Sequence, residues 1–78
     1  MKTMPIEDTS GQFIEFYKKK ADNLVVISEN HYKNKELRKS LELLSQAYAF
    51  YKKAGAPEKA EETKKLFEVI KAEVKKSP

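Results

Sequence analysis

LRKSLELLSQAYAFYKKAGAPEKAEETKKLFEVIKAEV, residues 37–74, is the stretch that decides the fold of this chain. Gly55 and Pro57 divide it into two halves, and in each half apolar residues recur at the spacing of one helix face. Gly suits a helix end in the left-handed conformation, and Pro suits the first position of the next helix. The stretch therefore predicts two helices joined by a tight turn. The apolar positions are Leu37, Leu41, Leu44, Tyr48 and Tyr51 before the turn, and Ala60, Thr63, Phe67, Ile70 and Val74 after it.

The residues before this hairpin predict one more helix. Phe13, Tyr17 and Leu24 recur along one helical line, and Ser10, or Thr9 before it, is a suitable N-cap. The β-branched run at residues 25–27 favours a strand, but a lone strand would have no partner, so we expect a helix. Asn34 is expected to cap the second helix. Residues 1–9 show no periodicity, and we expect them to be flexible.

The second helix is expected to lie at the centre of the fold. Ser40, Ala47 and Ala54 are seven residues apart in its apolar arc, and small side chains there let a neighbouring backbone approach closely. The first and third helices would then pack on its two sides. We expect a flexible segment at 1–9 and a single domain over 10–76, with helices at about 10–32, 35–54 and 57–75.

The hairpin over residues 41–74 resembles a single tetratricopeptide repeat. In that family a bulky and a small residue of the first helix pack against an Ala early in the second, across a turn with Gly. The residues at matching spacings are Leu44, Ala47, Tyr51, Gly55 and Ala60. The residues that depart from the family pattern are Tyr48, Lys64, Phe67 and Ala72. The predicted fold class is all-α, a three-helix antiparallel bundle with a tetratricopeptide-like hairpin. The resemblance implies a protein-interaction module whose groove receives a partner segment.

The composition bears on where the protein is found and on which kinds of site it can form. The chain has no Cys, so a disulfide or a thiolate metal site is excluded. Its longest apolar run, residues 24–27, is far shorter than the roughly 20 residues that span a bilayer. The start has no apolar signal-peptide core, and we expect a soluble, cytoplasmic protein.

No residue pattern predicts catalysis. His31 is the only histidine, and Gly11 and Gly55 are the only glycines, so a phosphate-cradling loop is not available. The nucleophile pattern G-x-S-x-G is also missing. Most acidic residues lie among lysines, as on solvated helix faces. We therefore predict that the chain is not an enzyme and that it holds no cofactor and no metal.

The formal charge of +4 is concentrated in residues 18–53, which carry nine basic against four acidic residues. This excess allows a less favoured alternative, a small basic nucleic-acid-associated protein. Because the chain has a single Arg, lysine contacts to phosphate would give weak and salt-sensitive binding. The residues concerned are Lys18, Lys19, Lys20, Lys33, Lys35, Arg38 and Lys39.

The favoured hypothesis is a protein–protein interaction module, an adaptor or small regulatory protein, that binds a partner helix or peptide in an apolar groove beside the second helix. Leu43 and Phe50 lie seven residues apart on the flank of the second helix. They are either core residues or part of an exposed apolar strip. Such a strip would also suit a self-assembling homo-oligomer, the other alternative. The predicted partner-binding residues are Phe16, Leu43, Phe50 and Tyr51, with Lys39 and Lys53 as rim charges.

Overall fold

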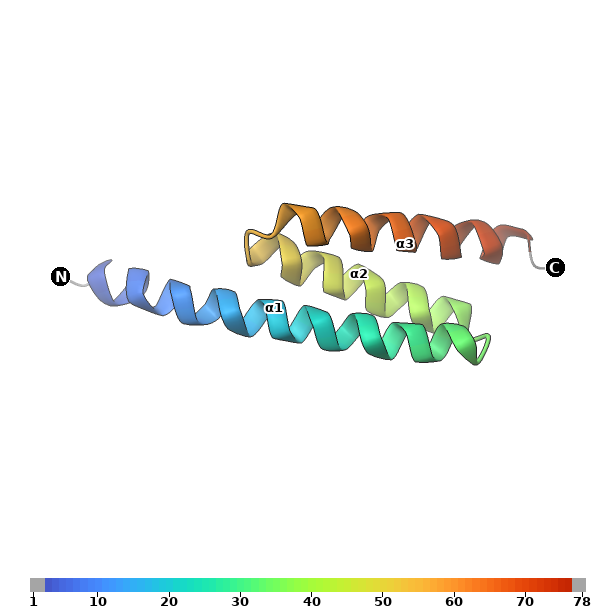
Figure 1. Ribbon diagram of the computed structural model, residues 1–78, viewed down its shortest axis with the longest axis horizontal. Helices are drawn as coiled ribbons and strands as arrows, with labels where there is room; N and C mark the ends of the chain where they lie inside the picture. The colour runs from blue at the N-terminus through green and yellow to red at the C-terminus, as the bar shows by residue number, and fades with distance from the viewer. Residues whose placement is uncertain (1–2, 77–78) are drawn as a thin grey trace.

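Three helices build the protein in an up-down-up order (Figure 1). The computed structural model describes the backbone of residues 3–76 and the side chains of residues 13–76. Helix α1 spans Thr3–Lys33, α2 spans Leu37–Lys53 and α3 spans Pro57–Lys76. The described backbone contains no strand. The predicted all-α three-helix bundle is confirmed.

Helix α2 lies between the other two, as its small residues predicted. Both α1 and α3 pack along α2, and almost no backbone contacts join α1 directly to α3. Ser40 and Ala47 of α2 and Ala54, the residue that follows the helix, are all buried. Ala21 and Ser28 of α1, which are likewise seven residues apart, are fully buried. Small side chains on both helices let the two backbones approach closely.

The core is small and combines all three helices. Leu44 of α2 and Ile70 of α3 are its largest fully buried side chains. Ala21, Tyr51 and Ala60, one residue from each helix, belong to a single apolar cluster. A domain of this size buries a modest fraction of its surface, so individual core contacts are a large share of its stability.

The turn between α2 and α3 ends α2 with a Schellman motif. The Gly55 N–H donates to Lys52 O, and the Ala56 N–H donates to Tyr51 O. Gly55 adopts a left-handed φ of 68°, which a residue without a Cβ tolerates at little cost. Pro57 is the first residue of α3, where no N–H is needed. The predicted turn chemistry matches the structure at both residues.

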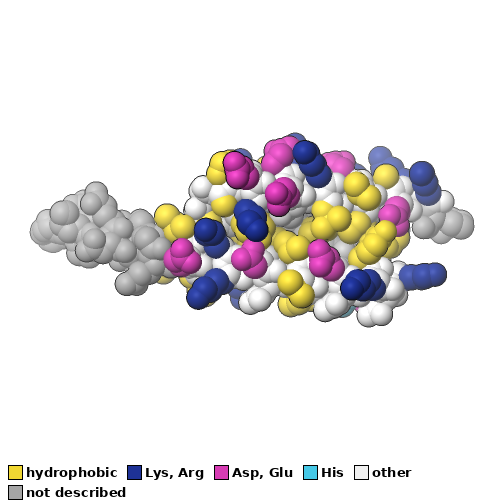
Figure 2. Space-filling model, in the orientation of Figure 1, with side chains coloured by type: hydrophobic (Ala, Val, Ile, Leu, Met, Phe, Trp, Pro, Cys, Tyr) yellow, Lys and Arg dark blue, Asp and Glu magenta, His cyan; other side chains and the backbone are white. Residues whose placement is uncertain are grey.

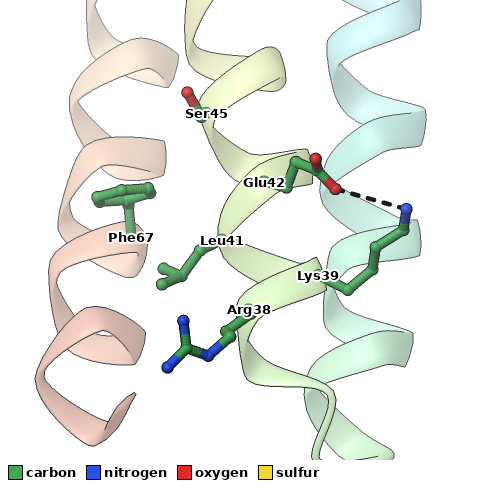
Figure 3. Close-up of a pocket in the computed structure, with 6 residues that line it drawn as sticks. All are labelled: Arg38, Lys39, Leu41, Glu42, Ser45 and Phe67. Carbon is green, nitrogen blue, oxygen red and sulfur yellow. Dashed lines mark ion pairs between the residues drawn. The ribbon is translucent and has the colours of Figure 1, made fainter. Parts of the chain in front are cut away.

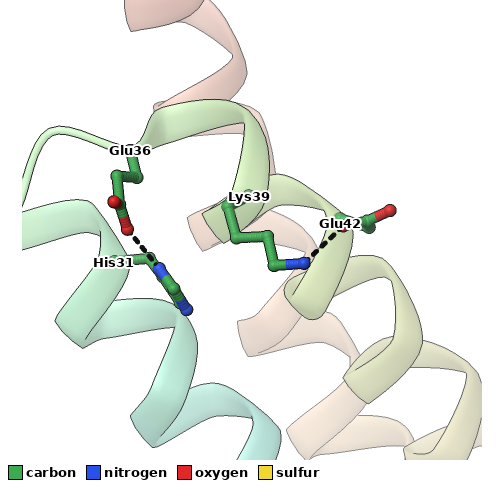
Figure 4. A network of polar contacts seen from close by, with 4 residues as sticks. All are labelled: His31, Glu36, Lys39 and Glu42. Carbon is green, nitrogen blue, oxygen red and sulfur yellow. Dashed lines mark hydrogen bonds and ion pairs between the residues drawn. The ribbon is translucent and has the colours of Figure 1, made fainter.

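The turn between α1 and α2 corrects one expectation. Asn34 does not cap α2, because Asn34 and Lys35 terminate α1 and α2 begins only at Leu37. Glu36 stands at the N-cap position but makes no side-chain cap hydrogen bond. Its carboxylate instead lies 2.5 Å from His31 Nδ1, as Figure 4 shows. His31 therefore has a structural partner at the end of its own helix.

Helix α1 starts earlier than the sequence predicted. Its first residue is Thr3, so Thr9 and Ser10 lie inside the helix and not at an N-cap. Residues 3–9 of the segment that was expected to be flexible have helical backbone, and residues 1 and 2 lie outside the described residues. Pro5 does not interrupt the helix, since the N–H groups of a first turn have no intrahelical acceptor. The N-terminal part of α1 extends past the α2–α3 turn (Figure 1). Within residues 3–76, no helix is apolar over enough of its length to cross a bilayer.

Candidate functional site: the grooves beside helix α2

A shallow groove runs between α2 and α3, and we call it the α2/α3 groove. It consists of two adjoining hollows that share Ser45 and Phe67 in their linings. Figure 3 shows Leu41 and Phe67 directed toward one another from the two helices, with Arg38 at one end. The full lining is Arg38, Lys39, Leu41, Glu42, Leu44, Ser45 and Tyr48 of α2, and Lys64, Phe67 and Glu68 of α3.

Helical spacing places the apolar lining on one side of α2. Leu41, Leu44 and Tyr48 follow one another at steps of three and four residues. Leu44 is fully buried and forms the floor, whereas Leu41 and Tyr48 are half-buried and stay in reach of a ligand. The lining extends from Arg38 to Tyr48, about 15 Å along the helix axis. That length matches about three turns of a partner helix.

The rim of the α2/α3 groove is basic on balance. Lys39 Nζ lies 3.4 Å from Glu42 Oε1 (Figures 3 and 4). This exposed pair neutralises two of the rim charges and adds little stability. Arg38 and Lys64 then stand against Glu68, and none of these three forms an ion pair within the described residues.

A second groove lies on the other side of α3, and we call it the α1/α3 groove. Figure 2 shows apolar side chains in a strip between α1 and α3, flanked by both acidic and basic side chains. Its floor is Tyr51, which is only 3% exposed. The groove is lined by Asp22, Val25, Val26 and Glu29 of α1, Tyr51 of α2, and Lys59, Glu62, Thr63 and Leu66 of α3.

Two tyrosine hydroxyls connect the helices around the α1/α3 groove. Tyr51 donates a hydrogen bond to Asp22 across the α1–α2 interface. Tyr32 donates to Glu73 Oε2 at 2.7 Å and joins the C-terminal parts of α1 and α3. Burial, followed by the hydrogen bond and charge of Asp22, raises the pKa of Tyr51. The hydrogen bond to the Glu73 carboxylate raises the pKa of Tyr32. Both phenols are therefore neutral donors at neutral pH.

An aromatic cluster lies where α1 passes the end of α2. The rings of Tyr17 and Phe50 stack at 5.6 Å, and Phe16 packs edge-on against Tyr17 at 5.7 Å. Lys53 Nζ lies 5.6 Å from the Tyr17 ring centroid and 5.8 Å from that of Phe50. Phe16 is 55% exposed, so the cluster is partly open to solvent. Cation–π contacts of this kind hold the lysine over apolar surface.

The predicted partner-binding residues do not form one site. Phe16, Phe50 and Lys53 come together in the aromatic cluster, whereas Lys39 lies on the rim of the α2/α3 groove and Tyr51 on the floor of the α1/α3 groove. Leu43 and Phe50 are half-buried and pack against the core cluster.

Sequence reasoning missed the residues that line the α2/α3 groove. Leu41 and Phe67 belong to the predicted apolar stripes but are not among the predicted partner-binding residues, and both are half-buried walls of the groove. Ser45, the exposed residue at its centre, has no chemical signature of a site. Helical periodicity identifies the apolar face of a helix and not the part of it that a neighbour covers.

Comparison with protein-family models, with curated proteins and with solved structures finds no match to this chain. The resemblance of residues 41–74 to a tetratricopeptide repeat thus rests on sequence spacing. Among the described residues, no group of three or more His, Asp or Glu side chains is placed to hold a metal ion.

Proposed function

We propose that this protein is a non-catalytic interaction module that binds an amphipathic helix of a protein partner in the α2/α3 groove. The observation that carries the proposal is the set of apolar side chains that line the groove from both helices. Leu41, Tyr48 and Phe67 are half-buried there, and no described segment of the chain covers them. A helix that lays its apolar face into such a groove buries these side chains further.

The partner helix is expected to carry acidic residues beside its apolar face. Arg38 and Lys64 flank the groove on α2 and α3, and the whole chain has a net charge of +4. Opposite charge on the partner speeds association and disfavours basic competitors. The apolar contacts supply most of the affinity, because exposed ion pairs contribute little.

Selection from a display library of amphipathic helical peptides of about 15 residues tests this proposal. Enriched peptides are expected to place apolar residues at helical spacing and Asp or Glu beside them. Ser45→Arg fills the centre of the groove with a long basic side chain and should weaken binding at least about tenfold. Gln46→Arg adds the same side chain at the neighbouring exposed position outside the groove lining, and it should bind as the wild type does.

Three results would overturn the proposal. The first is selection without any amphipathic pattern, and the second is equal binding to the Ser45→Arg and Gln46→Arg variants. The third is affinity that falls steeply with salt and is matched by an oligonucleotide, which would favour the nucleic-acid alternative. Light scattering of the free protein tests the self-assembly alternative, because that alternative requires a molar mass of more than one chain per particle.

A further inference from the structure

The α1/α3 groove has the opposite electrostatic character to the α2/α3 groove. Asp22, Glu29 and Glu62 line it together with a single basic residue, Lys59. This acidic excess lies on a chain whose overall charge is +4, so it is a local feature and not a consequence of composition. We propose that the α1/α3 groove is a second docking site, which takes an amphipathic helix flanked by Lys or Arg. This inference does not depend on the proposed function of the α2/α3 groove.

The groove offers apolar surface to such a helix. Val26 on the α1 wall is 56% exposed, and Leu66 on the α3 wall is half-buried. Tyr51 closes the floor with its ring, while its hydroxyl is already bonded to Asp22. An incoming apolar side chain therefore meets carbon and not an unpartnered hydroxyl, so its burial is favourable.

The carboxylates stand on both walls. Glu29 belongs to α1 and Glu62 to α3, and both side chains are exposed. Neither forms an ion pair within residues 13–76. A helix lying between the walls would bring a Lys or Arg on each flank within reach of one carboxylate. Carboxylates therefore stand on both sides of the apolar strip, with Lys59 as the one basic residue of the lining, and this net negative charge favours a partner with Lys or Arg on its flanks.

Contacts within the protein itself hold the groove in shape before any ligand binds. Almost no backbone contacts join α1 to α3, and the hollow between them has Tyr51 of α2 as its floor. The Tyr51–Asp22 and Tyr32–Glu73 hydrogen bonds connect the surrounding helices. A preorganised site lowers the entropic cost of binding. The α1 wall, from Asp22 to Glu29, is about 10 Å long and matches about two turns of a partner helix.

Three synthetic peptides with the same length are the probes for this inference. The first has an apolar face flanked by Lys, the second the same apolar face flanked by Glu, and the third the composition of the first with its apolar face scrambled. Binding to the full chain is measured by fluorescence anisotropy. The Lys-flanked peptide is expected to bind at least about tenfold more tightly than the scrambled one. Its amide shift changes should fall on residues 22–29 and 59–66.

Neighbouring glutamates supply a matched pair of variants. Glu62→Lys reverses a charge that lines the groove, whereas Glu61→Lys reverses an exposed charge outside its lining. Glu62→Lys should weaken binding of the Lys-flanked peptide at least about tenfold, and Glu61→Lys should change it by less than about twofold. Circular dichroism checks that both variants keep their helices. Equal effects of the two substitutions, or equal binding of the scrambled peptide, would overturn the inference.

Two further outcomes separate this groove from the other. Ser45→Arg should leave binding of the Lys-flanked peptide unchanged, because Ser45 lies in the α2/α3 groove. Loss of that binding in Ser45→Arg would place the peptide in the wrong groove and contradict the inference. A dimer that dissociates when Glu62→Lys is introduced would show that a second copy of the chain is the occupant, which also contradicts it.

Discussion

Lys35 and Gly55 hold the same left-handed backbone conformation, with φ of 65° and 68°, and each ends a helix. The pattern of hydrogen bonds around them is also the same. Lys35 N–H donates to Tyr32 O, just as Gly55 N–H donates to Lys52 O. The α1–α2 turn and the α2–α3 turn thus have the same backbone structure, but only the α2–α3 turn has Gly, the residue that suits the left-handed conformation.

Replacing Lys35 by Gly should stabilise the protein. A left-handed residue with a Cβ costs about 1–2 kcal/mol, and the greater freedom of Gly in the unfolded chain offsets part of the gain. We expect a net increase of about 0.5–1 kcal/mol in the free energy of unfolding, measured by urea denaturation. Lys35→Ala keeps the strain and should change stability little. A Lys35→Gly protein no more stable than Lys35→Ala would contradict this account of the turn.

The opposite substitution, Gly55→Ala, should destabilise the protein by about 1 kcal/mol. No atom outside the immediate chain lies within 4 Å of a Cβ placed at Gly55, so the loss reflects backbone strain and not a clash. Gly55→Asn should lose less, since Asn tolerates the left-handed region better. The unfolding temperature is expected to be highest for the wild type, lower for Gly55→Asn and lowest for Gly55→Ala. If Ala proves as stable as Gly, the left-handed conformation is not required.

Ser40→Ala is expected to raise stability by about 1 kcal/mol. The Ser40 hydroxyl is fully buried and has no hydrogen-bond partner among the described residues. Removing a buried polar group without a partner removes its desolvation cost. Ser28 is a matched control, because it is equally buried but donates to Val25 O at 2.7 Å. Chemical denaturation should show a larger gain in the free energy of unfolding for Ser40→Ala than for Ser28→Ala. Equal gains would contradict the view that the Ser40 hydroxyl is buried without a partner.

The stability of the wild type should fall as the pH rises above the ordinary tyrosine pKa of 10.0, in part because of Tyr51. Folding raises the pKa of Tyr51, so the unfolded state loses this proton first. The contribution is fully present below pH 10.0 and is lost as the pH climbs toward the folded-state pKa. Urea midpoints measured from neutral to alkaline pH check this slope.

Tyr51→Phe removes the titrating group and the hydrogen bond to Asp22 together. At neutral pH it should cost about 1.5–3 kcal/mol, the range for a hydrogen bond to a charged acceptor. Above pH 10.0 its stability should fall less steeply than that of the wild type. Parallel slopes for the two proteins would show that Tyr51 does not carry the alkaline sensitivity.

Helical periodicity and turn chemistry predicted much of the fold. The pattern around Gly55 and Pro57 located the α2–α3 turn, and the small residues at 40, 47 and 54 indicated that α2 is central. The first turn was misplaced because Lys35 adopts a left-handed conformation without any Gly to indicate it. The start of α1 was misplaced because Pro5 disfavours only the interior of a helix, and here it stands in the first turn.

The candidate sites were harder to predict, for a physical reason. Phe67 lies on the predicted apolar stripe of its helix and Leu43 on the flank of its own, yet Leu43 packs against the core and Phe67 forms the wall of a groove. Which part of a stripe is covered depends on where the neighbouring helix crosses it, and the spacing of residues in one helix does not contain that information.

The measurement that tests the central claim most directly is the footprint of a selected acidic amphipathic peptide on the isotope-labelled protein, read from amide chemical shifts. The account predicts that the perturbed amides fall on residues 38–48 of α2 and 64–68 of α3, and that Ser45→Arg removes the perturbation. A footprint centred on α1, or one that persists unchanged in Ser45→Arg, would contradict the claim that the α2/α3 groove is where this protein binds its partner.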